Sequence, residues 1–287
     1  MKKLLIDSNY ICHRAWHVLG GLEYEEYPTG VIFGFLNEIL SLSIKFKTNK
    51  FIFCWDSKNN LRKKIDKNYK QNRNKLSLEK RKEVEPLYKQ ITLTRKKILP
   101  AIGFKNNYIS NGLEADDLLA HIVQNIPYNE YIIISADNDL FQLLPYCDMY
   151  SLNTKILYTE KVFEKMYKYD SKDWWKIKAL AGCSSDNVIG VPGVGEKTAI
   201  KYFKKELNPK TKTYKKIKNQ WNSTFAKNYK LVKLPLKKIN LPYLTTDDFN
   251  LDNFLTLCNK LDFQSFLNKE KLDKWKYFFK LQETNTE

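Results

Sequence analysis

The chain of 287 residues lacks the features of a disulfide-bonded, zinc-binding or membrane-spanning protein. Its five cysteines are odd in number and form no CxxC pair, which favours reduced thiols over a disulfide framework. No apolar run approaches the roughly 20 residues of a membrane span. The N-terminus begins like a signal peptide, but Asp7 interrupts its short apolar stretch, so we predict a first strand there. These absences favour a cytoplasmic protein.

Basic residues outnumber acidic ones, and they are concentrated in two segments. The formal net charge is +17; residues 58–97 hold 15 Lys/Arg and 4 Asp/Glu, and residues 197–238 hold 14 Lys and 1 Glu. The rest of the chain is therefore net negative. A negative site between basic segments suits a metal-dependent enzyme that acts on a polyanion. The alternative is an AT-rich genome that enriches lysine, but such a bias would not gather the charge in two places.

Predicted strands alternate with predicted helices along the chain, and this order indicates an α/β fold with a mostly parallel sheet flanked by helices. We expect strands at 3–7, 51–56, 105–109 and 131–136, a loop after the first strand, and helices over 31–46, 77–99 (capped by Ser77), 114–124 and from 138. The character changes near residue 171. There, helices over 171–181, capped by Ser171, and 197–205 enclose a glycine-containing loop. Residues 208–240 are lysine-rich without a clear pattern, whereas 241–287 regain apolar residues and are expected to pack back onto the body.

Carboxylates stand at the ends of the predicted strands. In a parallel sheet, ligands gather at the carboxyl ends of the strands. So many like charges at one edge would repel each other unless cations lie among them, and oxygen ligands without His or Cys pairs suit Mg²⁺ or Mn²⁺. A helix N-terminus or an Asx turn would explain one or two of these acids, but not all of them. We therefore predict a metal site formed by Asp7, Asp56, Glu114, Asp116, Asp117, Asp137, Asp139 and Asp186.

Two further segments carry features of nucleic-acid binding. Gly190, Gly193 and Gly195 let the backbone approach a phosphate, and the helix expected near Glu196 aims free N–H groups at it. A purely structural turn between two helices is the alternative. The segment from Tyr69 to Arg73 places an aromatic ring among cations, where it could stack on a base. A solvated basic loop would look the same on spacing alone.

Six motifs together resemble the structure-specific 5′-nucleases, the flap endonucleases and 5′–3′ exonucleases. They are LLIDSN, FCWD, YKQNR, LEADD, ISADNDLFQLL and AGCSSDNVIGVPGVGEKTA. The similarity is greatest to the free-standing bacteriophage members and to the nuclease domain of bacterial DNA polymerase I, and it extends to about residue 240. The resemblance implies a PIN-like nuclease domain over 1–170 with a helical arch at about 58–99. It also implies a helical DNA-binding domain over 171–287, with a helix–three-turn–helix at about 171–206.

The resemblance also implies roles for particular residues. Asp7, Asp56, Glu114 and Asp116 would hold one divalent ion, and Asp117, Asp137, Asp139 and Asp186 would surround a second. K⁺ would bind at the helix–three-turn–helix. Residues implied to act in catalysis are Lys70 and Arg14, and those implied to contact DNA are Tyr69, Arg73, Lys178, Gly190, Gly193, Gly195 and Lys197.

One position departs from the family pattern. Cys183 stands where the family usually has a metal-site Asp, and a thiol is a poor ligand for Mg²⁺. The expected activity is still metal-dependent cleavage of DNA near 5′ ends and at flaps, nicks or RNA primers, by a monomer that serves a replication polymerase in a bacterial or phage-infected cell. Two alternatives stay open: a PIN-type ribonuclease, which would not need the second helical unit, and a DNA-binding accessory protein with a weakened metal site.

Overall fold

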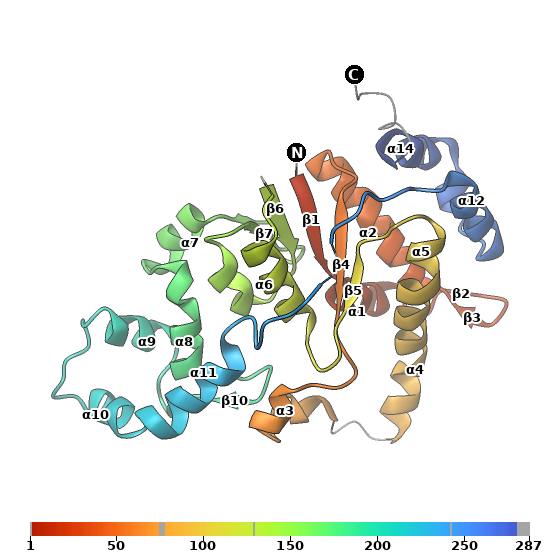
Figure 1. Cartoon of the computed structure of the whole chain (residues 1–287). Helices are drawn as coiled ribbons and strands as arrows, with labels where there is room; N and C mark the ends of the chain where they lie inside the picture. The colour runs from red at the N-terminus through yellow and green to blue at the C-terminus, as the bar shows by residue number, and fades with distance from the viewer. Residues whose placement is uncertain (1, 75–77, 129, 242, 280–287) are drawn as a thin grey trace.

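Six strands form one sheet at the centre of the chain (Figure 1). The computed structural model describes residues 2–74, 78–128, 130–241 and 243–279. Strands from β5 to β7 run parallel, and β8 pairs with β7 in the antiparallel sense. The predicted mostly parallel sheet is thus confirmed. Its order is β5 (Asn107–Ile109), β4 (Phe51–Trp55), β1 (Lys2–Asp7), β6 (Glu130–Ile134), β7 (Asp148–Tyr150) and β8 (Leu157–Tyr158).

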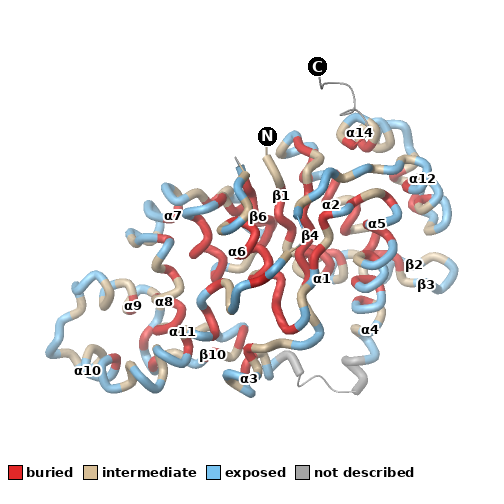
Figure 2. The backbone as a smooth tube through the Cα atoms, viewed as in Figure 1, coloured by how far each residue is buried: buried red, intermediate tan, exposed pale blue. Residues whose placement is uncertain are grey.

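Helices cover both faces of the sheet because the central strands are apolar on both sides. Leu4 and Ile6 of β1 belong to the core beneath α1 (Ser8–Leu19) and α2 (Gly30–Phe46), whereas Leu5 belongs to the core beneath α6 (Ala115–Asn125). This alternation follows the two-residue period of a strand. Burial is accordingly concentrated in β1, β4, β6 and the helices against them (Figure 2).

Four local expectations need correction. Residues 8–19 form a helix rather than a loop, because Asp7 ends β1 and also caps α1 by accepting from Tyr10 N at 3.1 Å. The helix that follows β6 is a 3₁₀ helix, η3 (Asn138–Leu143). Asp170 rather than Ser171 caps the next segment, since its side chain accepts from Lys172 N (3.0 Å) at η4 (Ser171–Asp173).

Residues 77–99 are not one uniform helix; α4 (Leu78–Leu93) passes into a π-helical turn, η2 (Thr94–Ile98), and α5 (Leu99–Ala101). Ser77 lies outside the described residues.

The segment of residues 56–74, which follows β4, crosses the end of the sheet at which β1 and β4 finish (Figure 1). It contains α3 (Arg62–Ile65) and the 3₁₀ turn η1 (Gln71–Asn74). Two short hairpins complete the small elements: β2 (Glu23–Tyr24) with β3 (Tyr27–Pro28), and β9 (Gly182–Cys183) with β10 (Val188–Ile189).

The helices after residue 159 lie in two groups on opposite sides of the sheet (Figure 1). One group holds α7 (Glu160–Tyr167), α8 (Trp174–Ala181), α9 (Glu196–Phe203), α10 (Lys212–Asn219), η5 (Trp221–Phe225) and α11 (Ala226–Val232). The last three, α12 (Leu251–Lys260), α13 (Gln264–Leu267) and α14 (Lys269–Phe279), bury Phe254, Phe266 and Trp275 in the same core as Phe35 of α2. The expected return of the C-terminal segment to the body is confirmed. Each described helix is too short or too polar to cross a bilayer.

Candidate active site

The sheet topology brings three of the predicted acids, Asp7, Asp56 and Asp137, to one edge. β1, β4 and β6 are adjacent and parallel, so the residues that follow their carboxyl ends lie side by side. Asp7 accepts from Ser135 Oγ (2.9 Å), just beyond β6, and Asp56 accepts from Ala115 N (2.8 Å) at the first turn of α6. These bonds join the ends of β1, β4 and β6 to the helix that carries Asp116.

Three acids at this edge, Asp7, Asp116 and Asp137, hold their protons more tightly than free carboxylates do. Burial, and then the charge of Asp56, raises the pKa of Asp7 to about 7. Burial and Asp139 raise the pKa of Asp137 to about 6, and burial with Asp137 and Asp7 raises the pKa of Asp116. Each shift reports a buried carboxylate short of positive charge. An oxygen-rich group of this kind fits a hard divalent cation.

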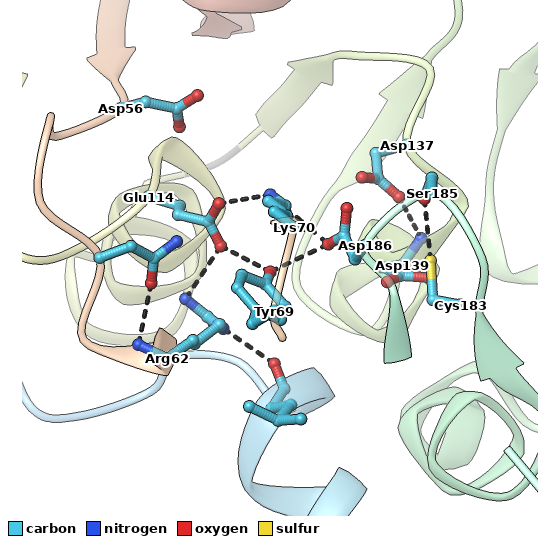
Figure 3. A network of polar contacts seen from close by, with 12 residues as sticks. Asp56, Arg62, Tyr69, Lys70, Glu114, Asp137, Asp139, Cys183, Ser185 and Asp186 are labelled. Carbon is cyan, nitrogen blue, oxygen red and sulfur yellow. Dashed lines mark hydrogen bonds and ion pairs between the residues drawn. The ribbon is translucent and has the colours of Figure 1, made fainter. Parts of the chain in front are cut away.

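Tyr69 and Lys70 lie between Glu114 and Asp186 (Figure 3). The Tyr69 hydroxyl is 2.8 Å from Glu114 Oε2 and 2.9 Å from Asp186 Oδ2, and can donate to one of them at a time. Lys70 Nζ pairs with Glu114 and lies 3.4 Å from Asp186 Oδ2. Burial alone would raise the pKa of Glu114, but Lys70 and Arg62 outweigh it and lower that pKa. Only 3% of the Tyr69 surface is exposed in this arrangement, and its expected stacking on a base stays a prediction.

Asp117 does not face the other acids. Its Oδ2 accepts from Arg62 Nη1 at 2.6 Å and its Oδ1 from Arg62 Nη2 at 2.8 Å, in a fully buried bidentate pair. Oδ1 also accepts from Leu236 N (2.8 Å). With both oxygens taken, Asp117 is not available to a cation, which corrects its prediction as a metal ligand. Sequence reasoning also missed Arg62, since only the fold brings residues 62 and 117 together.

Lys178 points into the acidic site and not toward solvent. Its Nζ is 2.9 Å from Asp139 Oδ1 and 3.2 Å from Glu196 Oε1, and the residue is buried. In this arrangement its side chain is a counter-charge for Asp139, and the expected contact of Lys178 with DNA stays a prediction. Nearby, ligand atoms of Asp139, Cys183 and Asp186 lie within 4.8 Å of one another. The Cys183 thiol is 3.0 Å from Ser185 Oγ.

The glycines of the loop before α9 serve two different purposes. A Cβ on Gly190 would lie 2.1 Å from Ala181 O, so this glycine permits close packing against the end of α8. Gly193 has a φ of +83°, and a Cβ there or on Gly195 would meet open space. Gly193 and Gly195 are exposed, so a ligand can approach their backbone, and the exposed Lys197 lies just inside α9.

One predicted residue, Arg14, is not brought into the acidic site by the contacts of the described chain, and the side chain of another, Arg73, cannot be placed. Arg14 Nη1 donates to Asn153 Oδ1 (2.6 Å), and the guanidinium lies 5.9 Å from the Tyr10 ring centroid. Arg73 falls in η1, but its side chain lies outside the described residues. The proposed roles of both residues stay predictions.

A buried carboxylate group at the end of a parallel α/β sheet, with a lysine inserted from a crossing basic segment, is an arrangement suited to hydrolysis of phosphate esters. The family described as 5′-3′ exonuclease, N-terminal resolvase-like domain, matches residues 2–168. The chain is 32% identical to a 5′-3′ exonuclease of Buchnera aphidicola subsp. Schizaphis graminum, over 92% of this chain and 96% of that one. It is 30% identical to a 5′-3′ exonuclease of Aquifex aeolicus, over 82% of each chain.

Solved structures show the same fold. The T5 5′-exonuclease with bound zinc aligns with a TM-score of 0.69 at 22% identity, covering 82% of this chain and 90% of that one. The chain belongs to the 5′-3′ exonuclease family. It is accordingly a 5′ nuclease, a phosphodiester hydrolase.

Proposed function

We propose that the chain cleaves DNA near 5′ ends and at single-strand/double-strand junctions, using Mg²⁺ or Mn²⁺ bound at the acidic edge. The observation that carries this proposal is the group of buried carboxylates at the ends of β1, β4 and β6, where the pKa of Asp7 is raised to about 7 and that of Asp137 to about 6. Divalent cations, when bound, neutralise the scissile phosphate and activate the attacking water.

The proposed ligands fall into two groups that differ from the expected pair by the removal of Asp117. Asp7, Asp56, Glu114 and Asp116 would hold one cation; Asp137, Asp139 and Asp186 would hold a second, more weakly because Cys183 adds no carboxylate. Lys70 would leave Glu114 and Asp186 to contact the scissile phosphate. Its backbone N–H, which donates to Asp186 O at 2.8 Å, keeps the base of its side chain at the site during that movement.

A duplex-binding role for the second helical unit is part of the same proposal. The open backbone at Gly193 and Gly195 and the exposed Lys197 suit contact with a phosphate backbone without base readout. K⁺ binding there rests on the resemblance alone. In this proposal residues 1–170 and Asp186 perform the chemistry, and the rest of the unit that begins at 171 holds the duplex, while α12–α14 support the nuclease core. Primer or flap removal beside a polymerase would be the cellular role.

One cleavage assay separates the proposal from its alternatives. A labelled 5′ flap, a nicked duplex and a single-stranded RNA are each incubated with the chain, with Mg²⁺ or with EDTA. We expect cleavage of the two DNA substrates only with Mg²⁺. Preferred cleavage of RNA would favour the ribonuclease, and DNA binding without cleavage would favour the accessory protein.

A further inference from the structure

Arg62 is a buried arginine that joins three parts of the chain far apart in sequence. It lies in α3, in the segment that crosses the sheet edge, and its side chain is 2% exposed. Nε donates to Leu231 O (2.8 Å) in α11, while Nη1 and Nη2 donate to Asp117 of α6. Every part of the guanidinium is therefore directed at a partner, and the planar group fixes the relative positions of α3, α6 and α11.

The same guanidinium also reaches a proposed metal ligand. Arg62 Nη1 is 3.3 Å from Glu114 Oε2, which is also the oxygen that faces the Tyr69 hydroxyl (Figure 3). Glu114 N donates to Asp117 Oδ2 (3.1 Å), so the Arg62–Asp117 pair also holds the backbone of Glu114. One carboxylate oxygen of Glu114 is thus held by Arg62 and Tyr69, which leaves the Oε1 side toward Lys70 and the other acids.

The contacts continue from α11 to the loop proposed to bind duplex. Asn228 of α11 is buried, and its Nδ2 donates to Ala179 O in α8 and to Ile189 O in β10, each at 2.9 Å. Ile189 directly precedes Gly190, and the exposed Gly193 and Gly195 follow in the same loop. A series of polar contacts therefore runs from the glycine loop through Asn228 and Leu231 to Arg62 and Glu114.

We propose that Arg62 is a positioning residue that holds Glu114 in a fixed place relative to the duplex-binding loop. In this way it sets the affinity for the cation at Glu114 and selects which phosphodiester of a bound duplex is cut. The proposal rests on the proposed function for its second part. Its first part concerns binding of a cation to the protein alone and does not depend on cleavage.

Two conservative variants test the proposal. R62K keeps the positive charge but a single ammonium cannot make the bidentate and Nε contacts together. D117N keeps the shape of the pair but replaces an acceptor oxygen with a donor. The matched control is K227M, because Lys227 Nζ pairs with Asp66 Oδ2 (2.6 Å) and so also joins α11 to the crossing segment, without touching Glu114.

Two measurements are made on each variant that melts cooperatively. Mn²⁺ binding without DNA is followed by the EPR signal of free Mn²⁺, and incision positions are mapped on a 5′-labelled flap. We expect R62K and D117N to weaken one Mn²⁺ site by about tenfold, the lower end for loss of an outer-shell partner, and to spread incision over neighbouring bonds. K227M should match the wild type in both.

Several outcomes would overturn the inference. Wild-type Mn²⁺ affinity in folded R62K or D117N would show that Arg62 does not position Glu114. Equal losses in K227M would show that any bond between α11 and the crossing segment suffices. If R62K does not fold, D117N decides the matter. If the wild type binds Mn²⁺ but cuts no DNA, the proposed function fails, while the Mn²⁺ comparison still decides the role of Arg62.

Discussion

Asp7 and Glu114 are both buried acids of the same site, yet their pKa values move in opposite directions. Asp7 accepts from a backbone N–H and a serine hydroxyl and faces the charge of Asp56, and its pKa rises to about 7. Glu114 faces Lys70 and Arg62, and its pKa is lowered despite a burial that alone would raise it. Burial is common to both, so the difference comes from the neighbouring cations. The Asp7 side therefore needs a bound cation for its charge, whereas the Glu114 side has the protein's own cations.

The largest effects on cleavage and stability should come from replacing each of these two acids with its neutral amide. We expect D7N and E114Q each to reduce cleavage by more than the roughly 100-fold that loss of an outer-shell partner costs. Their effects on metal-free stability at pH 8 should be opposite. D7N removes a carboxylate short of positive charge and should raise the melting temperature in EDTA. E114Q removes one of the acids that face Lys70 and Arg62, which keep Asp186 and Asp117, and should lower the free energy of unfolding by up to about 3 kcal/mol.

Thermal melting in EDTA and single-turnover cleavage give both values for each variant. Ser41 is exposed on α2 and donates to Asn37 O of its own helix, so it offers a control site: S41A should change neither measurement. Stability changes of the same sign in D7N and E114Q would contradict the contrast between the two sides.

Replacing Lys70 tests the same contrast by removing a cation rather than an acid. We expect K70A to lower the rate of the chemical step by about 10²–10³, the scale for loss of one group that stabilises transition-state charge. Metal affinity should not fall with it, because the Lys70 ammonium now lies against Glu114 and Asp186 and competes with cations there. Single-turnover rates at saturating Mg²⁺, with Mn²⁺ titrations, separate the two effects. A loss of DNA affinity with an unchanged rate would reduce Lys70 to a surface cation.

The pH dependence of stability gives a smaller but more direct test. Because the folded-state pKa values of Asp7 (about 7) and Asp137 (about 6) are raised from 3.8, the folded chain retains protons that the unfolded chain releases. The stability due to these groups is present below about pH 4 and is lost as pH rises through 7. Mg²⁺ binds the deprotonated acids, so the gain in melting temperature from EDTA to Mg²⁺ should grow between about pH 5.5 and 8. D7N should show a flatter profile, and a wild-type gain independent of pH would contradict the shifts.

The sequence predicted the parts of the site that depend on local pattern. The end of a strand can be recognised from the residues around it, and parallel pairing then brings Asp7, Asp56 and Asp137 to one edge. The sequence did not show partners that are distant along the chain: Asp117 was assigned to metal because its bond to Arg62 spans 55 residues, and the contact of Lys178 with Asp139, on another element, was not foreseen.

Helix α1 was missed for a related reason. Asp7 ends a strand and caps a helix at the same time, and the pattern assigns a residue only one of these roles. Tyr69 is similar, since the spacing shows an aromatic among cations but not the two acids that enclose it. Sequence pattern therefore located the acidic edge, and only the fold shows which charges meet there.

Substitution of Cys183 should give the smallest effect. This residue lies beside Asp139, which already faces the ammonium group of Lys178. Burial, and then the charge of Asp139, raises the pKa of the Cys183 thiol, so it stays protonated at neutral pH and adds no charge for a hard cation. C183D would add a carboxylate beside Asp139 and Asp186. We expect it to lower the Mg²⁺ concentration for half-maximal cleavage by a few-fold and to favour nicked duplex over flaps. C183S, which removes the sulfur without adding charge, should resemble the wild type in Mg²⁺ titrations on both substrates. Superimposable curves for C183D and C183S would mean that Asp139 and Asp186, with Lys178 beside them, already satisfy the second cation.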